Sequence, residues 1–369
     1  MFIESLALNN YRNYENADIT FSDGINILYG DNAQGKTNIL EAIYMTATTK
    51  SHRGSKDKEI VEFGKDESHI KTQLKKNDIG HRIDIHLRKS KSKGIAIDMI
   101  PIKRSADLFG MINIILFSPE DLSIIKNGPS ERRRFMDMEL CQLNRIYYNN
   151  LSTYNKILNQ RNNQLKADMY GKNTDLLDVW DSQLIDYGLK IINERNNFID
   201  MINEIIEDIH NHLTDGKERL KLIYDKNVTE ENFAIELCNK RDMDIRLMNT
   251  SVGPHRDDII FMINDIDVRK FGSQGQQRTV ALSLKLAEIE LVKKIINDNP
   301  ILLLDDVMSE LDTGRRNALL SSINGIQTII TCTGYDDFIK ERLNIDKIYK
   351  IEQGKISLMK MNETGGSYE

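Results

Sequence analysis

Apolar and polar residues alternate along much of the segment 1–120, which is the pattern of β-strands with one buried face. The alternating runs are residues 2–8, 17–21, 69–75, 82–88 and 94–100. Turn-forming residues at 77–80 and 89–94 separate the last three runs, so these runs predict an antiparallel meander. We expect the meander to be appended to the sheet that contains the short apolar strand 25–29.

The chain changes to a helical pattern after Pro119. One apolar stripe recurs at spacings of three and four, and it consists of Leu140, Leu143, Tyr147, Leu151, Tyr154 and Leu158. This stripe predicts a single long helix. A second stripe runs from Trp180 to Ile209, after a polar break at 171–173. Two long amphipathic helices joined by a turn predict an antiparallel hairpin.

Strands and helices alternate in the last part of the chain. The expected strands are 258–263, 266–268, 301–304 and 328–331, and the expected helices are 276–296 and 315–323. This alternation predicts a parallel sheet. Because the chain has no internal repeats, we expect one α/β head built from both chain ends. The predicted domains are 1–118, the N-terminal half of the head with its β lobe; 119–248, an inserted α-helical domain; and 249–369, the C-terminal half.

Composition excludes several classes of protein. The 369-residue chain has 29% charged residues, five prolines and a net charge of −6, so it is a globular protein without a uniformly basic surface. Any contact with nucleic acid therefore needs a local basic patch. The longest apolar runs, 112–117 and 301–304, are too short to cross a bilayer. The N-terminus lacks a signal-peptide pattern, so we expect a cytoplasmic location and no membrane partner.

Cysteine and histidine give no sign of a metal site. The three cysteines, Cys141, Cys238 and Cys332, are far apart and form neither a disulfide framework nor a zinc pattern. The histidines show no metal-ligand spacing along the chain. We expect structural or surface roles for all of them.

The most specific motif is the segment 30–37, which reads GDNAQGKT and fits G-x-x-x-x-G-K-[ST]. The apolar strand 25–29 precedes it, and the pattern of 38–44 predicts a helix after it. A strand, a glycine-bounded loop and a helix start bring backbone N–H groups around one point, which binds phosphate. Lys36 would reach the β- and γ-phosphates, and Thr37 would ligate Mg²⁺. The expected nucleotide-binding residues are Gly30, Asp31, Asn32, Ala33, Gln34, Gly35, Lys36, Thr37 and Asn38.

The buried strand 301–304 ends in Asp305 and Asp306. Carboxylates at the end of such a strand reach the edge of the sheet where the phosphate loop lies. Asp305 is placed to hold Mg²⁺, and Asp306 could position or activate the attacking water. We therefore expect Lys36 and Asp306 to be the catalytic residues.

A second anion site is expected where the helix 276–296 begins. Residues 271–278 read FGSQGQQR, and a serine and a glycine at a helix N-terminus favour a bound anion. A monomer needs only one phosphate loop for its nucleotide. We therefore expect the group Ser273, Gln274, Gly275 and Gln276 to serve the nucleotide of a partner subunit.

These motifs resemble those of ABC-type ATPase heads. The segment 273–276 is similar to the Ser-Gly-Gly-Gln signature, with Gln274 at a position that is usually glycine. The four residues Ser309, Glu310, Leu311 and Asp312 resemble the D-loop. A head divided between both chain ends is similar to the SMC-like DNA repair ATPases. Within that class the chain resembles the RecF family over nearly its whole length, at 8–14 (LNNYRNY), 119–137 (PEDLSIIKNGPSERRRFMD), 253–258 (GPHRDD) and 303–312 (LLDDVMSELD).

The resemblance implies a P-loop ABC-type ATPase head that binds ATP and Mg²⁺ and forms an ATP-dependent homodimer on DNA. It further implies a role in DNA replication, in recombinational repair of DNA damage and in the SOS response. The DNA would be a single-stranded gap or its junction with duplex, where RecR and RecO help to load recombinase.

Three departures from the ABC pattern limit this reading. Asp306 stands where a glutamate is usual, no histidine lies near Cys332, and no glutamine lies near Ser118. Since water attack depends on positions good to about an ångström, we expect weak, DNA-stimulated ATP hydrolysis. Hydrolysis would act as a release timer rather than as the main activity.

Basic residues supply the candidates for DNA contact, because arginine and lysine bind phosphate. They are Arg132, Arg133 and Arg134, with Lys126, Arg145 and Arg161 nearby, and Lys50, Arg53, Lys56 and Lys58 in the β lobe. Such a run is often only a solvated helix face. The alternative function is a P-loop small-molecule kinase or phosphotransferase, which would not need residues 273–276 and would stay monomeric with ATP.

Overall fold

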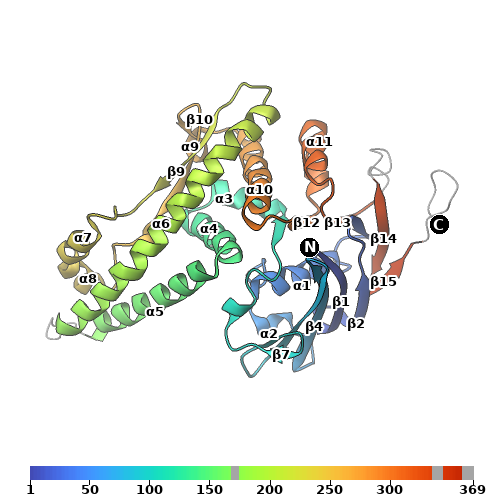
Figure 1. Ribbon diagram of the computed structural model, residues 1–369, viewed down its shortest axis with the longest axis horizontal. Coiled ribbons are helices and arrows are strands. Elements are labelled where there is room, and N and C mark those ends of the chain that lie inside the picture. The colour runs from blue at the N-terminus through green and yellow to red at the C-terminus, as the bar shows by residue number, and fades with distance from the viewer. Residues whose placement is uncertain (168–173, 335–343, 360–369) are drawn as a thin grey trace. The chain divides into compact units, whose positions relative to one another are not determined.

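The computed structural model describes residues 1–167, 174–334 and 344–359. The chain forms two compact units, one made of Met1–Asp121 and Glu288–Glu369, the other of Leu122–Ala287. We refer to them as unit 1 and unit 2 (Figure 1). Among the described residues, no helix has both the length and the apolar character needed to span a membrane.

Unit 1 contains a mostly parallel sheet with the strand order β15-β14-β3-β13-β12-β8. Its strands are β3 (Ile25–Tyr29), β8 (Ile114–Phe117), β12 (Ile301–Asp305), β13 (Thr328–Cys332), β14 (Ile345–Glu352) and β15 (Lys355–Leu358). Only β15 runs antiparallel to its neighbour. β8, β12 and β13 are buried at every position, as expected for parallel strands covered on both faces. The predicted parallel sheet is confirmed, and it joins strands from both chain ends.

The other sheet of unit 1 is antiparallel, in the order β2-β1-β4-β5-β6-β7. Its strands are β1 (Phe2–Tyr11), β2 (Tyr14–Thr20), β4 (Glu67–Lys76), β5 (Ile79–Arg88), β6 (Gly94–Ile97) and β7 (Ile100–Pro101). The expected meander is present, but its attachment to the sheet of β3 was predicted wrongly. β3 has no free edge for the meander, because β13 and β14 pair with its two edges. The meander instead joins β1, whose edge pairs with β4.

Helix α1 (Lys36–Thr48) packs between the two sheets of unit 1 (Figure 1). Its buried side chains, among them Ile39, Leu40 and Ile43, share one apolar core with residues from both sheets. Each such side chain contributes about 1.5–3 kcal/mol when it leaves water. This core fixes the first turn of α1, and with it the loop 30–35. The remaining helices of unit 1 are α2 (Asp57–Ile60), α11 (Thr313–Ser322), η1 (Ser105–Asp107), η2 (Pro119–Asp121) and η4 (Val307–Glu310).

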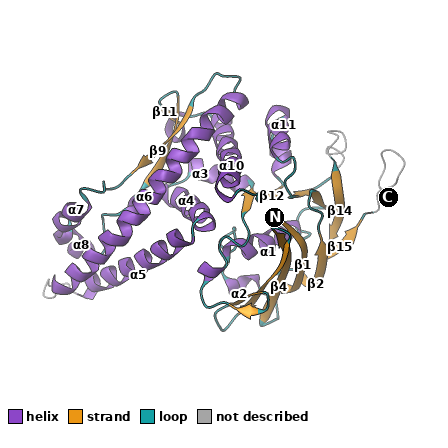
Figure 2. Ribbon diagram, in the orientation of Figure 1, coloured by secondary structure: helices purple, strands orange, loops and turns teal. Residues whose placement is uncertain are grey.

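Unit 2 is mostly helical and has one small sheet (Figure 2). Its helices are α3 (Leu122–Lys126), α4 (Pro129–Leu143), α5 (Arg145–Ala167), α6 (Thr174–Leu213), α7 (Phe233–Asn239), α8 (Arg241–Leu247), η3 (Pro254–Arg256), α9 (Val268–Phe271) and the first part of α10 (Gln274–Ile296). α5 and α6 lie side by side and run in opposite directions, as predicted for the hairpin (Figure 1). The polar break expected at 171–173 lies outside the described residues.

The prediction of one helix through 140–158 is wrong, because Asn144 divides it. Asn144 has an extended backbone, with φ −139° and ψ 105°. Its Oδ1 accepts hydrogen bonds from the backbone N–H groups of Ile146 (2.9 Å) and Tyr147 (3.3 Å). Asparagine thus ends α4 and caps α5, which the apolar stripe alone does not reveal.

The units divide the chain differently from the predicted domains over residues 249–287. β9 (Leu220–Asp225) pairs with β10 (Asp258–Ile263), and β10 pairs with β11 (Ile266–Asp267), in an antiparallel sheet. This sheet ties 249–287 to unit 2, whereas the sequence assigned these residues to the C-terminal half of the head. The division into functional domains stays a prediction.

Candidate functional site

The loop between β3 and α1 depends on glycine at two positions. Gly30 has φ +151° and Gly35 has φ +118°, both in the region that side chains avoid. A Cβ on Gly30 would lie 2.2 Å from the Ile351 carbonyl oxygen, and one on Gly35 would lie 2.7 Å from the Tyr14 hydroxyl. The two glycines of the motif therefore allow the loop to turn sharply and to pack closely against its neighbours.

Lys36 is a buried cation whose hydrogen bonds go only to backbone oxygens. Its side chain is 4% exposed, and its ammonium donates to the carbonyls of Gly30 (2.6 Å) and Asp31 (3.0 Å). Within the described ranges it forms no ion pair with a carboxylate. A buried ammonium is costly without a counter-charge, so this loop favours an anionic ligand.

The tip of the β1–β2 hairpin contacts the loop, a contact that the sequence did not predict. Asn13 donates to the Gln34 carbonyl (3.0 Å) and accepts from the Asn38 amide (2.8 Å). The Tyr14 hydroxyl donates to the Gly35 carbonyl (3.0 Å). The only sequence signal is that Asn13 and Tyr14 fall in the segment 8–14 quoted for the family resemblance.

A buried carboxylate on α1 links that hairpin to the helix. Glu41 accepts from the Arg12 guanidinium (2.6 Å), the Tyr11 hydroxyl (3.1 Å) and the Ser51 hydroxyl (2.5 Å). Burial raises the pKa of the Glu41 carboxyl, but hydrogen bonds from Arg12 and Ser51 outweigh it and bring the pKa below its usual range. The charged cluster therefore clamps β1 to α1 beside the loop.

Thr37 and Asp305 come together as the sequence predicted. The Thr37 hydroxyl donates to Asp305 Oδ1 (2.9 Å), and the Thr331 hydroxyl donates to the same oxygen (2.8 Å). Burial raises the pKa of Asp305, which these hydrogen bonds only partly offset. A hydroxyl and a carboxylate are the hard oxygen donors that Mg²⁺ prefers. This donor set fits the magnesium ion of a bound nucleotide.

Asp306 follows in a left-handed conformation, with φ +53°. Its backbone N–H donates to Thr331 Oγ1 (3.0 Å), and its half-buried carboxylate has no protein hydrogen-bond partner in the part of the chain that is described. Cys332 is nearby, in the region where the ABC pattern has a histidine. Burial raises the pKa of its thiol to about 12, so the thiol stays protonated. It is no substitute for a general base.

The predicted signature residues start α10 in unit 2. Ser273 Oγ accepts from the Gln276 N–H (3.2 Å), and Gln276 Oε1 accepts from the Ser273 N–H (2.9 Å). This reciprocal capping box satisfies two N–H groups that the helix end leaves unpaired. Ser273, Gln274 and Gly275 are exposed, and Gln276 also donates to Glu218 (2.9 Å).

The D-loop candidates follow Asp306 directly. Ser309 donates to the Asp306 carbonyl (2.8 Å), and Glu310 and Leu311 lead from η4 to the next helix. Asp312 caps α11 through the Arg315 N–H (3.0 Å). Ser309, Glu310 and Asp312 are exposed.

Arg132 has to be withdrawn from the DNA candidates. It is 1% exposed, pairs with both carboxylate oxygens of Asp258 (2.5 and 2.9 Å) and donates to the carbonyls of Ile124 and Asn127. The hydrogen bonds of this guanidinium are therefore made inside unit 2, and it is not available to DNA phosphate. The helical periodicity of α4, which also buries Phe135 and Met136, is the signal that could have identified it.

The other DNA candidates differ in exposure. Arg133 is half-buried and donates to the Asp257 carbonyl (2.6 Å). Arg161 is wrong as a candidate, because it is fully buried and pairs with Asp181 and Asp244. The remaining ones are exposed, namely Lys126, Arg134, Arg145, Lys50, Arg53, Lys56 and Lys58. Arg53 donates to the side chain of Asn38 (3.3 Å), one of the expected nucleotide-binding residues.

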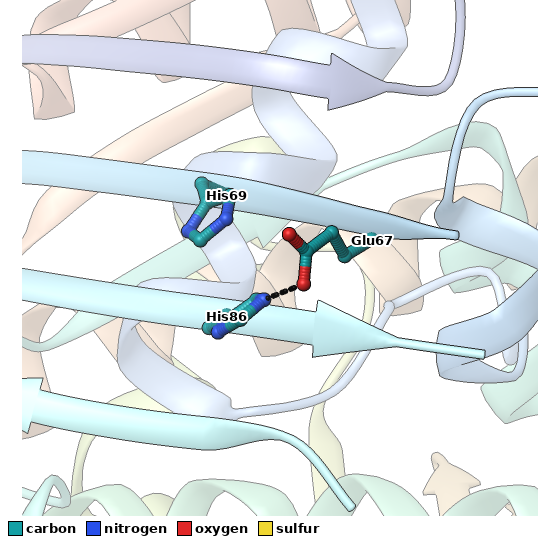
Figure 3. Close-up of side chains that lie close together, drawn as sticks. All are labelled: Glu67, His69 and His86. Carbon is teal, nitrogen blue, oxygen red and sulfur yellow. Dashed lines mark hydrogen bonds and ion pairs between the residues drawn. The ribbon is translucent and has the colours of Figure 1, made fainter. Parts of the chain in front are cut away.

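A second group of chemically active side chains lies on the antiparallel sheet. Glu67 and His69 of β4 lie close to His86 of β5, and their ligand atoms are all within 4.8 Å of one another (Figure 3). The spacing of histidines along the chain gave no sign of this group, because the pairing of β4 with β5 brings His69 and His86 together. The signal was present in the turn: a two-residue turn at Asn77 and Asp78 places residue 69 opposite 86.

Comparison with known proteins relates the chain to one family. Residues 2–357 match the family model described as RecF/RecN/SMC N terminal domain. The chain is 59% identical to the DNA replication and repair protein RecF of Lachnoclostridium phytofermentans, over 96% of this chain and 99% of that protein. It is also 59% identical to the protein of the same description from Lachnospira eligens, with the same shares of each chain.

A solved structure matches the fold of the chain as well. It is described as the recombination mediator protein RecF-ATP in the RecFOR pathway. The match covers 97% of each chain with a TM-score of 0.90 and 35% sequence identity.

Proposed function

The chain belongs to the RecF/RecN/SMC family, and we propose that it is a RecF-type ATP-binding protein of DNA replication and repair that acts in the RecFOR pathway. The further proposal is that ATP and Mg²⁺ close two copies of the chain into a clamp on DNA. In this scheme the nucleotide acts chiefly as a switch of assembly.

One observation carries the proposal: within the described residues the buried Lys36 has no carboxylate partner, and the next residue of α1, Thr37, donates a hydrogen bond to the buried Asp305. Lys36 would bind the β- and γ-phosphates, together with the N–H groups of the loop and of the first turn of α1. Thr37 and Asp305 would hold Mg²⁺, which neutralises phosphate charge when it is bound.

Asp306 is the residue that we propose to position the attacking water. Its carboxylate is next to Asp305 and has no protein partner in the described ranges, so it is available to a water molecule. It is one methylene shorter than the glutamate usual at this position. Hydrolysis is therefore expected to be weak and to time the opening of the dimer.

The start of α10 supports the proposal of a dimer. Ser273, Gln274 and Gly275 are exposed at the N-terminus of a 23-residue helix, where a partial positive charge favours an anion. In the closed dimer these residues would contact the nucleotide held by Lys36 of the other copy.

DNA and the pathway proteins complete the proposal. Exposed basic residues, among them Arg134, Lys50, Arg53 and Lys56, are the candidates for contacts to DNA phosphate. The preferred DNA would be a single-stranded gap or its junction with duplex. RecR and RecO would be the partners that load recombinase there.

The mass of the protein in solution, measured by light scattering with and without MgATP, tests the clamp. The wild type should dimerise only with nucleotide, and both Lys36→Met and Ser273→Arg should stay monomeric. Ser182→Arg is the matched control, because Ser182 is an exposed helix residue of the same unit, outside the signature. It should dimerise like the wild type.

Two outcomes would contradict parts of the proposal. A wild type that stays monomeric at saturating MgATP removes the clamp, whereas ATP binding itself could still stand. If ATP leaves DNA affinity unchanged at a fixed salt concentration, nucleotide and DNA are not coupled. The alternative of a small-molecule kinase is not supported, since the relatives are described as DNA replication and repair proteins.

A further inference from the structure

The group of Glu67, His69 and His86 is held together by strand register. His69 and His86 are direct partners in the antiparallel pair of β4 and β5, and Glu67 lies two residues before His69. Because side chains alternate between faces, Glu67 and His69 point to the same face of the sheet. Ser68 and Ile70 point to the opposite face and are buried.

The three side chains lie close enough together for small rotations to bring their ligand atoms around one ion. The imidazole rings of His69 and His86 are stacked, with centroids 4.0 Å apart and planes inclined by 22°. His86 Nε2 and Glu67 Oε2 are 2.7 Å apart (Figure 3). All three ligand atoms lie within 4.8 Å of one another. A tetrahedral zinc site has ligand atoms roughly 3.4 Å apart, so side-chain rotations of about 1–1.5 Å would complete it.

Solvent can reach this group. The side chain of Glu67 is 54% exposed and that of His86 is 31% exposed. On the far side of His86 the paired residue is Gly94, which has no side chain, and the Arg88 guanidinium lies over it: Arg88 Nη2 is 3.3 Å from where a Cβ on Gly94 would be. Arg88, opposite Glu67, is the nearby positive charge that an ion would have to tolerate.

We propose that Glu67, His69 and His86 form a binding site for a divalent transition metal ion, with zinc as the ion of choice. Two imidazole nitrogens and one carboxylate oxygen are a ligand set that zinc uses, and water would complete the coordination. Magnesium prefers oxygen ligands only, so this site is distinct in chemistry from the pair of Thr37 and Asp305. The bound ion would cross-link β4 to β5.

Zinc binding by the full chain tests the site directly. The protein carries Cys238→Ser, because Cys238 is an exposed thiol that could bind zinc. Excess Mg²⁺ without nucleotide occupies the oxygen ligands Thr37 and Asp305, since ATP itself would chelate zinc. Equilibrium dialysis should find one zinc ion per chain. His69→Gln and His86→Gln should each weaken binding by at least about 100-fold, since loss of even an outer-shell partner costs 10–100-fold. Glu67→Gln should weaken binding by about tenfold or more.

His81→Gln is the matched control. His81 lies on the same strand β5, its side chain is 24% exposed, and it pairs with Asp98 outside the site. This variant should bind zinc as the parent does. If zinc affinity is unchanged in both His69→Gln and His86→Gln, or falls equally in His81→Gln, the assignment is wrong.

A measurement on the unsubstituted histidines avoids any effect of mutation on folding. Diethyl pyrocarbonate modifies accessible neutral imidazoles, and mass spectrometry of peptides locates the modified residues. Zinc should protect His69 and His86 while leaving His81 and His212 as reactive as before. Equal modification of His69 and His86 with and without zinc would refute the site.

Discussion

Unit 1 and unit 2 treat buried cationic groups in different ways. In unit 2, Arg161 is fully buried and pairs with Asp181 (2.5 Å) and Asp244 (2.7 Å). Arg195 likewise pairs with Asp137 (2.8 Å) and Asp257 (3.2 Å). In unit 1, Lys36 is almost as buried, but among the described residues its hydrogen bonds go to backbone carbonyls alone.

This difference distinguishes cations that stabilise the fold, such as Arg161 and Arg195, from a cation that is proposed to bind a ligand, Lys36. A buried cation with carboxylate partners is neutralised by its own fold, and it stabilises the geometry around it. A buried cation that contacts only carbonyl oxygens has no negative charge to neutralise it within the protein. For Lys36 we propose that the phosphates of the nucleotide supply this negative charge. Four changes test this distinction, from the largest expected effect to the smallest.

Arg161→Met should destabilise the protein by about 3–5 kcal/mol, because it leaves the buried Asp244 without its counter-charge. Asp181 keeps a second cationic partner, Arg241 (2.6 Å). Urea unfolding of the nucleotide-free protein measures this effect. Arg246→Met, an exposed arginine of the same unit, is the control and should change stability by less than about 0.5 kcal/mol. Equal losses in the two variants would contradict a structural role for the Arg161 cluster.

His255 shows another way in which unit 2 avoids an unpaired buried charge. Its Nδ1 accepts from the Tyr154 hydroxyl (2.7 Å) and its Nε2 donates to the Thr250 carbonyl (3.0 Å), so the neutral ring satisfies both contacts. Burial, together with Arg256, Arg133 and Arg195, lowers the pKa of His255 from 6.5 to about 4.

This pKa predicts a loss of stability in acid. Stability is fully present above the unfolded-state pKa of 6.5 and is lost as the pH falls to about 4, because only the unfolded chain accepts the proton readily. The contribution over this window is about 3 kcal/mol. The difference in unfolding free energy between the wild type and His255→Gln should shrink by this amount from pH 7 to pH 4. A difference independent of pH would show that His255 is not kept neutral by the fold.

Lys36→Met should leave stability nearly unchanged and weaken ATP binding by at least about 100-fold, or 2.7 kcal/mol, since a charge-assisted phosphate contact is lost. Isothermal titration with MgATP and a thermal melt of the nucleotide-free protein measure the two quantities. If Lys36→Met strongly destabilised the nucleotide-free protein, Lys36 would be a structural cation like Arg161 and Arg195. The proposed difference between the two units would then be wrong.

Arg133→Gln is expected to have the smallest effect. Arg133 is half-buried, its side chain donates to the Asp257 carbonyl, and burial together with Arg195 lowers its pKa. By the same reasoning as for Lys36, its loss should cost less than about 1 kcal/mol of stability. If it contacts DNA phosphate, the slope of log affinity against log salt should fall by about 1. An unchanged slope would remove it from the DNA candidates.

The sequence predicted the parts of the molecule that short segments encode. The strand 25–29, the loop after it and the start of α1 are consecutive, so their geometry follows from local pattern and from two glycines. The buried strand before Asp305 is equally local. Because parallel strands end at the same edge of a sheet, the contact between Thr37 and Asp305 could be expected as well.

Other predictions failed where partners far apart in the chain decide the result. The sequence indicated that Arg132 is an exposed cation. In the fold it is buried and paired with Asp258, which lies on another element far along the chain. The meander follows β1 rather than β3 because both edges of β3 are already occupied. The failure at Asn144 has a different, local cause: it ends a helix by accepting two backbone hydrogen bonds, which the apolar periodicity does not reveal.

The sequence by itself thus determined the phosphate loop, the strand with its carboxylates, the helical character of unit 2 and the family. The tertiary structure alone decided which cations are neutralised, which face solvent, and that His69 and His86 meet across two strands. The physical reason is that periodicity and turn chemistry act between neighbours in the chain. Burial and electrostatic pairing depend instead on elements that only the folded chain brings together.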